Sequence, residues 1–177
     1  MTVSAYTFKI ASEAWEFAQI HRLNYRTFAE EIPRRPANPR RSLPDAFHHE
    51  NVYLICLQRN LLVGMVAVRG QRPFSLDAKL PALDSYLPAG HSLCEIRLLA
   101  VRPRFRRGRV FAGLVDEAAQ YCRCQGYTLA LISGTVRQAK LYRHLGFMPF
   151  GPLVGTPKAL FQPMYLTAEA YQAARSR

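Results

Sequence analysis

The chain has 177 residues, of which 49% are hydrophobic, enough for a sizeable buried core. No run approaches the roughly 18 unbroken apolar residues that cross a membrane, and the N-terminus lacks the basic and apolar blocks of a secretory signal. We therefore expect a cytoplasmic protein in which residues 1–177 form one domain that ends in a polar tail helix at 167–177.

The formal net charge is +12, and of the 24 basic residues only Lys9, Lys79, Lys140 and Lys158 are lysines. Arginine suits fork-shaped contacts to phosphate or carboxylate groups. The charge is compatible with a nucleotide-type cofactor, an acidic carrier protein or nucleic acid, or with solubility alone. Composition therefore points to an anionic partner without identifying it.

The first half of the chain predicts a strand, a helix and a hairpin. Residues 3–10 alternate apolar and polar, and residues 12–30 repeat apolar side chains at helical spacing. Prolines make 33–44 a loop. The apolar runs 52–58 and 61–68, which Arg59 and Asn60 separate, predict a hairpin. Residues 70–90 are irregular, with a short helix around Ala78.

Strands and helices alternate in the second half. Strands are predicted at 92–101, 127–133, 147–150 and 159–167, and helices at 108–125, 135–145 and 167–176. This order predicts an α/β fold with a mixed sheet of six or seven strands and helices on both faces. The strands 94–101 and 127–133 are expected to form a splayed central pair.

Two charged side chains begin one face of the strand 94–101. Strict alternation places Glu95, Arg97, Leu99 and Val101 on one face, and the apolar Cys94, Ile96, Leu98 and Ala100 on the other. Glu95 and Arg97 are either a structural ion pair or a base and a substrate-orienting group at a cleft.

Five arginines crowd the start of the helix that follows: Arg102, Arg104, Arg106, Arg107 and Arg109. Cations are unfavourable at the positive end of a helix dipole, where free backbone N–H groups point outward. An anion bound between them would explain the arrangement, and a phosphate is the preferred candidate over a solvated basic loop.

With these motifs the chain resembles the GNAT superfamily of acyltransferases, from Val3 to Thr167. In that family an Arg/Gln-x-x-Gly-x-Gly/Ala turn holds the pyrophosphate of coenzyme A. The matching residues here are Arg106, Arg107, Gly108, Arg109, Val110 and Phe111. Arg109 and Phe111 replace the two family glycines, which weakens the close approach of backbone to phosphate that glycine permits.

The run AKLYRHLGFMPFG resembles a second family motif, A-x-x-L-Y-x-x-x-G-F, although Thr135 and Gln138 depart from its usual start. Tyr142 falls on the family tyrosine, which protonates the leaving thiolate. A phenol with a pKa near 10 suits that step. The alternative is a tyrosine that only packs.

The run IHRLNYRTFAEEI resembles the N-terminal part of N-acyl amino acid synthases and homoserine-lactone synthases, although Asn24 replaces their usual arginine. These enzymes often take acyl groups from acyl carrier protein, whose phosphopantetheine carries one phosphodiester and no nucleotide. We assign Phe28 to substrate binding on this resemblance, and Arg97 to substrate binding on its place in the strand 94–101.

The expected reaction is direct acyl transfer from coenzyme A or acyl-phosphopantetheine to a small-molecule amine. Glu95 would act as base and Tyr142 as acid, and the backbone of Leu99 and Val101 would grip the pantetheine. No metal is expected, because Cys122 and Cys124 have poor ligand spacing. The alternatives are a non-catalytic module that binds acyl thioesters or carrier protein, and a nucleic-acid binder, which the lack of aromatic residues among the arginines disfavours.

Overall fold

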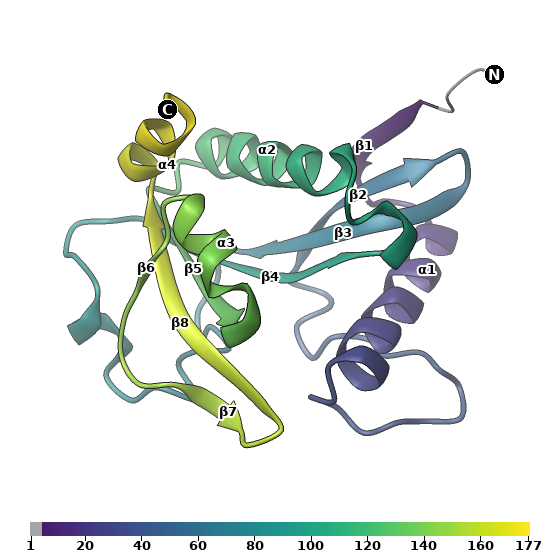
Figure 1. The fold of residues 1–177 in the computed structure, drawn as a ribbon, viewed down its shortest axis with the longest axis horizontal. Helices are drawn as coiled ribbons and strands as arrows, with labels where there is room; N and C mark the ends of the chain where they lie inside the picture. The colour runs from purple at the N-terminus through teal and green to yellow at the C-terminus, as the bar shows by residue number, and fades with distance from the viewer. Residues whose placement is uncertain (1–4) are drawn as a thin grey trace. The chain divides into compact units, whose positions relative to one another are not determined.

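A computed structural model describes residues 5–177, and residues 3 and 4 of the predicted first strand lie outside this range. The chain folds into two compact units. The first comprises the residues up to Val68 together with Arg97–Tyr121, and the second comprises Arg69–Ile96 together with Cys122–Arg177. The strand β4 (Leu93–Val101) continues from the second unit into the first (Figure 1).

The first unit places a helix on each face of the strands β2 and β3 (Figure 1). Side chains of α1 pack with one face of these strands in a core cluster that includes Ile20, Ile55 and Met65. On the other face, a Cβ on Gly64 would lie only 2.8 Å from Val110 of α2. The bounds are β1 Tyr6–Ile10, α1 Ala14–Tyr25, β2 Val52–Gln58, β3 Leu61–Arg69 and α2 Arg109–Cys124.

The helix α1 begins at Ala14, two residues after the predicted start, and has an acidic cap. The Glu16 carboxylate accepts hydrogen bonds from the backbone N–H groups of Ser12 (2.8 Å) and Glu13 (3.0 Å). These are donors that a helix start otherwise leaves without partners. After Tyr25 the helix widens into a π-helical segment, Arg26–Glu31, which ends where Ile32 N–H donates to the Thr27 carbonyl.

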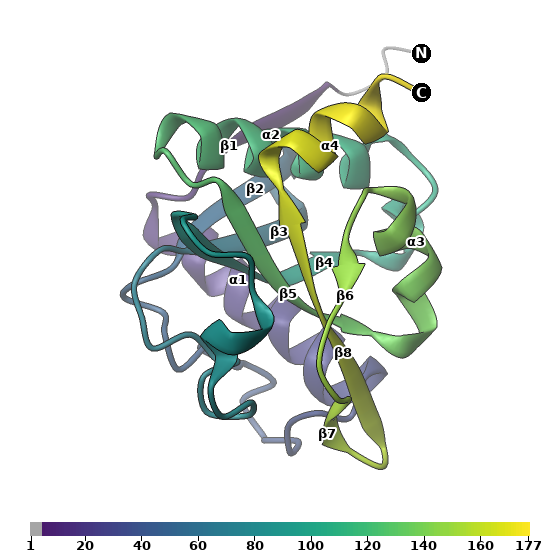
Figure 2. The same cartoon turned by 90° about the vertical axis from the view of Figure 1, so that its left-hand side faces the viewer.

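The second unit is built around the long strand β8 (Figure 2). β5 pairs with β8 over its whole length, and the shorter β6 and β7 also pair with β8, all antiparallel. The bounds are η2 Leu83–Tyr86, β5 Leu129–Thr135, η4 Val136–Gln138, α3 Ala139–His144, β6 Met148–Pro149, β7 Val154–Thr156, β8 Ala159–Thr167 and α4 Ala168–Arg175. In the first unit, a short 3-10 helix, η3, covers Pro103–Phe105.

Across residues 5–177 the sheet has eight strands, and the order β1-β2-β3-β4-β5-β8-β6 is continuous because β4 belongs to both units. β1–β2 and β2–β3 are antiparallel, whereas β4 and β5 run parallel. This is the mixed α/β sheet that the sequence predicts, with one strand more. The extra strand is β7, three residues long, which is too short for a hydrophobic pattern to reveal.

The irregular segment 70–90 differs from its prediction. No helix forms at Ala78; turns occupy 75–79, and a 3-10 helix appears instead at Leu83–Tyr86. Asp77 holds the earlier turn, because its carboxylate accepts from the Phe74 N–H (2.6 Å) and from Arg72. Pro81 lacks the N–H that a longer helix needs.

Candidate active site

Glu95 lies on β4 in the second unit, and its side chain is almost completely buried, with 1% exposed. Its carboxylate accepts two hydrogen bonds from Ser75, one from the backbone N–H (2.9 Å) and one from the hydroxyl (2.5 Å). A buried carboxylate needs such donors, because an uncompensated charge in the interior is costly. Glu95 therefore holds the segment around Ser75 against the strand, whatever else it does.

Tyr142 lies on α3, and its ring packs in a cluster with Ile132, Phe147 and Met164. A Cβ at Gly134 would lie 2.8 Å from the ring, so the glycine provides the space that the tyrosine fills. The hydroxyl has a long contact, 3.4 Å, with Gln138 Oε1. Burial raises the pKa of Tyr142 above its usual value, so the phenol keeps its proton at neutral pH.

Glu95 and Tyr142 lie on opposite faces of the strands β4 and β5. Ile96, the neighbour of Glu95, packs in the Tyr142 cluster, as does Ile132. Glu95 is paired in register with Leu131, the neighbour of Ile132. Because successive side chains of a strand point to opposite faces, Glu95 and Leu131 face away from Tyr142.

The pairing of β4 with β5 covers only Leu93 to Glu95, opposite Leu129 to Leu131. β5 nevertheless continues to Thr135 in partnership with β8. This early end of pairing agrees with the splayed pair that the sequence predicts. Just beyond it, the Ser133 hydroxyl is buried and finds no hydrogen-bond partner among the described residues. Such an orphan is uncommon in a folded protein and marks a place where a ligand or water could bind.

The arginine turn belongs to the first unit and precedes α2. Arg106 is engaged within the protein, where its Nε donates to the Val101 carbonyl (2.8 Å) and its Nη2 to Glu31 (2.5 Å). Arg107 and Arg109 are exposed. A Cβ at Gly108 would meet only the Phe105 carbonyl, at 3.7 Å. The turn therefore offers fewer uncommitted guanidinium groups than the sequence alone indicates.

The other residues predicted to contact the donor differ in how accessible they are. The side chain of Val110 is fully buried and lies next to Gly64, so only the backbone of Val110 could contact a donor. Phe111 is partly buried. The carbonyl of Val101, predicted to grip pantetheine, already accepts from Arg106. Leu99 is half-buried.

Arg97 forms a buried ion pair in the first unit, and its environment corrects the expected pattern of β4. It donates to Asp45 with both terminal nitrogens and stacks over Phe47, with 4.9 Å between its Cζ and the ring centre. Through Asn51 this pair contacts Tyr53, in the same core cluster as Ala100. Arg97 and Ala100 thus share a face, although they are three positions apart.

The cause is Leu98, which has a φ of 55° in the left-handed region that L-residues seldom adopt. A residue in this conformation interrupts the strand and re-aims the side chains around it. The strict alternation predicted for 94–101 is therefore interrupted at Leu98, between Arg97 and Ala100.

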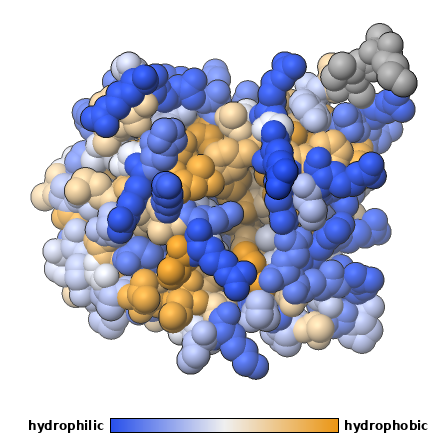
Figure 3. Space-filling model, viewed as in Figure 1, coloured by the Kyte–Doolittle hydropathy of each residue, from blue (hydrophilic) through white to orange (hydrophobic). Residues whose placement is uncertain are grey.

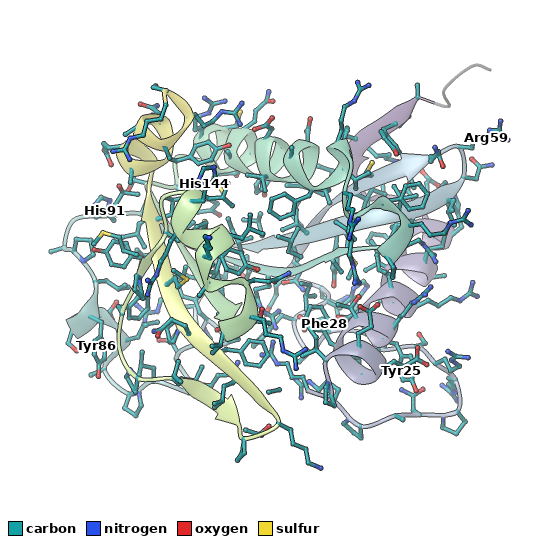
Figure 4. The ribbon with its side chains drawn as sticks, in the orientation of Figure 1. Tyr25, Phe28, Arg59, Tyr86, His91 and His144 are labelled. Carbon is teal, nitrogen blue, oxygen red and sulfur yellow. The ribbon has the colours of Figure 1, made fainter. Side chains whose placement is uncertain are left out.

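Phe28, predicted to bind substrate, lies in the core cluster of the first unit, in the π-helical segment that follows α1 and near Tyr25 (Figure 4). The Tyr25 hydroxyl accepts from the Asn38 N–H at 3.2 Å and so holds the proline-rich loop. Phe28 is thus buried in this structure, and any effect on substrate would act through the shape of the surrounding core.

Apolar side chains are exposed near the helix that carries Tyr142. Figure 3 shows hydrophobic surface gathered close to α3 and the strands β7 and β8, with hydrophilic side chains beside it. The exposed apolar residues on or next to these elements are Val136 in η4, Leu141 in α3, Leu153 just before β7 and Leu160 in β8. Arg137, Lys140 and Lys158, on or next to the same elements, are exposed basic residues. This combination suits an acyl chain or an acidic protein partner.

The fold is shared with known acyltransferases of the GNAT class. FeeM, an N-acyl amino acid synthase from uncultured soil microbes, superimposes with a TM-score of 0.76 at 15% identity, over 96% of this chain and 94% of FeeM. The homoserine-lactone synthase LasI gives 0.77 at 17% identity, over 97% and 95%. BjaI, a CoA-dependent acyl-homoserine lactone synthase solved with SAM and isopentyl-CoA, gives 0.74 at 18%, over 90% and 80%.

The model of the family "N-acyl amino acid synthase FeeM" matches residues 19–168. The chain belongs to this family, and it is therefore an N-acyltransferase, as its sequence predicts. No curated protein matches it significantly in sequence. Among residues 5–177, no helix has the length and apolar character to cross a membrane.

Proposed function

We propose that the protein transfers an acyl group from a thioester of coenzyme A or of carrier-bound phosphopantetheine to the amine of an amino acid or a related small molecule. The observation that carries the proposal is the placement of Tyr142, a partly buried phenol with a raised pKa whose hydroxyl has one long contact, to Gln138, among the described residues. The names of the family and of the FeeM and BjaI structures support the choice of donor and acceptor.

In the proposed reaction the amine nitrogen attacks the thioester carbonyl and the carbon–sulfur bond breaks. The proton of Tyr142 goes to the departing sulfur, and a proton of the amine goes to Glu95, directly or through water. The burial of Glu95 and its two bonds to Ser75 favour transfer through water. The orphan Ser133 hydroxyl is available to hydrogen-bond a substrate.

We assign the donor phosphates to the start of α2, mainly to Arg107 and Arg109, because Arg106 is already bonded to Val101 and Glu31. A carrier-bound donor presents one phosphodiester, which needs fewer contacts from this turn than the nucleotide of coenzyme A does. The prediction that residues 1–177 act as one domain stays a prediction.

Product analysis tests the proposal. The protein is incubated with acyl-CoAs of several chain lengths or with acyl carrier protein, together with amino acids and S-adenosylmethionine, and amides and free thiols are measured by mass spectrometry. We expect an N-acyl product and an equal amount of thiol. Thioester binding without any amide, under all donor and acceptor combinations, would contradict the proposal.

A further inference from the structure

Two cysteines that the proposed reaction does not use lie side by side in the second unit. The Sγ atoms of Cys94, on β4, and Cys122, in the last turn of α2, are 3.6 Å apart, although 28 positions separate them in the chain. A disulfide has an S–S distance of about 2.05 Å, so a shift of roughly 1.5 Å shared between a strand and a helix end would join them.

The two thiols differ in access. Cys94 has no exposed surface, whereas Cys122 is partly exposed. Their shared hydrogen bond lowers the pKa of the Cys122 thiol, and the same bond together with burial raises the pKa of Cys94. The charge of Glu95 also raises the pKa of Cys94, and burial together with the pair raises the pKa of Tyr127. Cys122 is therefore the reactive member and Cys94 the buried one.

The other cysteines provide a contrast within the same chain. Cys56 is fully buried, and burial raises the pKa of its thiol to about 11, which keeps it unreactive. Cys124 is exposed, two positions from Cys122 on the same helix. Residues two apart on a helix do not share a face, so Cys124 is not placed to reach Cys94 as Cys122 is.

We propose that Cys94 and Cys122 are a redox-active dithiol that a peroxide converts to a reversible intramolecular disulfide. The Cys122 thiol releases its proton, and the thiolate attacks one oxygen of hydrogen peroxide. The O–O bond breaks and the departing hydroxide takes up the released proton, so that a sulfenic acid and one water form. The Cys94 sulfur then attacks the Cys122 sulfur, its proton leaves with the displaced hydroxide as a second water, and the S–S bond forms. Two thiols are oxidised and one peroxide is reduced.

The bond would tie the last turn of α2 to β4 directly beside Glu95. Because Glu95 accepts two hydrogen bonds from Ser75, a shift of Cys94 would also move the segment around Ser75. Closing a loop of this length also restricts the unfolded chain, so the oxidised form should melt several degrees higher.

Peptide mapping tests the proposal on the full chain. Cleavage after lysine and arginine places each cysteine in its own peptide: Cys56 in 42–59, Cys94 in 80–97, Cys122 in 110–123 and Cys124 in 124–137. After mild peroxide treatment and alkylation of the remaining thiols, we expect peptides 80–97 and 110–123 to be linked. The link should disappear on treatment with dithiothreitol, while Cys56 and Cys124 remain alkylated thiols.

Three variants separate the roles of the two sulfurs. Cys122→Ser should abolish the link and leave Cys94 a free thiol. Cys94→Ala should trap Cys122 as sulfenic or sulfinic acid, and Cys124→Ser should behave as the wild type. Over-oxidation of Cys122 in the wild type while Cys94 stays reduced would overturn the proposal, as would a disulfide that involves Cys124 instead. Both readouts use the wild-type chain, so they hold even if Cys94→Ala fails to fold.

Discussion

Asp45 and Arg97, 52 positions apart in the chain, form a bidentate ion pair that is almost completely buried. The Nη1–Oδ2 and Nη2–Oδ1 distances are 2.5 and 3.1 Å, and the side chains are 6% and 7% exposed, respectively. Asp45 also accepts from Asn51 and from the Phe47 backbone. This pair joins the loop before β2 to the part of β4 that Leu98 distorts.

Asp45→Asn should destabilise the fold strongly, because it removes one charge of a buried pair and weakens the compensation of the other. We expect a loss of about 3 kcal/mol or more in the free energy of unfolding, measured by denaturant titration. Asp84→Asn is the matched control, since Asp84 pairs with Arg72 on the surface and is 69% exposed. The control should cost about 1 kcal/mol or less. Equal effects would contradict the importance of the buried pair.

The same carboxylate should contribute to acid sensitivity. Burial alone would raise the pKa of Asp45, but the bonds and charge of Arg97 outweigh it and hold that pKa below its usual value. A lowered folded-state pKa means that the stabilisation is complete above the unfolded value, about 3.9, and is lost as the pH falls through the folded value. The wild type should therefore lose stability below about pH 4 more steeply than Asp45→Asn does. Parallel curves of stability against pH would exclude Asp45 as a cause.

Tyr142→Phe should lower kcat and kcat/KM together, on the order of 100-fold or more, because it removes only the proton donor to sulfur. The ring still fills the space beside Gly134, so the melting temperature should change little. Tyr86→Phe, an exposed tyrosine, is the control. Because burial raises the pKa of Tyr142, alkaline loss of activity should set in only above its ordinary value of 10.0. Wild-type rates with an intact fold would show that Tyr142 only packs.

Glu95→Gln and Ser75→Ala together separate catalysis from anchoring. If Glu95 is the base, Glu95→Gln should lower the rate about 100-fold, most of all at low pH, where little of the amine is neutral. Ser75→Ala removes one of the two bonds to Glu95 and should mainly lower the melting temperature. If both variants lose stability and activity in the same proportion, Glu95 is an anchor and not a base. Arg97→Ala should not reproduce the Glu95→Gln pH profile.

Arg107→Ala should weaken donor binding about uniformly across acyl chains, and it should flatten the dependence of affinity on salt, because one phosphate contact is lost. Arg106→Ala should weaken binding less directly, through the loss of its bonds to Glu31 and Val101. Glu31→Gln is the control, since it releases Arg106 without removing it. Unchanged donor affinity in the Arg106→Ala/Arg107→Ala double variant would place the phosphates elsewhere.

The regular elements were predictable because their signals are local. Apolar periodicity located β2, β3, β4 and α2 to within a few residues, and the motif around Tyr142 placed it on a helix. The partners were not predictable, because they come from distant segments. Nothing in the sequence near Glu95 indicates Ser75, 20 positions away, and Arg106 meets Glu31 from 75 positions away. The left-handed conformation of Leu98 could not be predicted either, because leucine strongly favours a negative φ.

The opposite orientation of Glu95 and Tyr142 has a kinetic consequence under the proposed mechanism. If the amine arrives on the Glu95 side of the strands and the thiol departs on the Tyr142 side, neither substrate obstructs the path of the other. Donor and amine must be bound at the same time, and no covalent acyl-enzyme intermediate forms. Double-reciprocal plots at several fixed acceptor concentrations should then intersect, and free coenzyme A should compete with the donor but not with the amine.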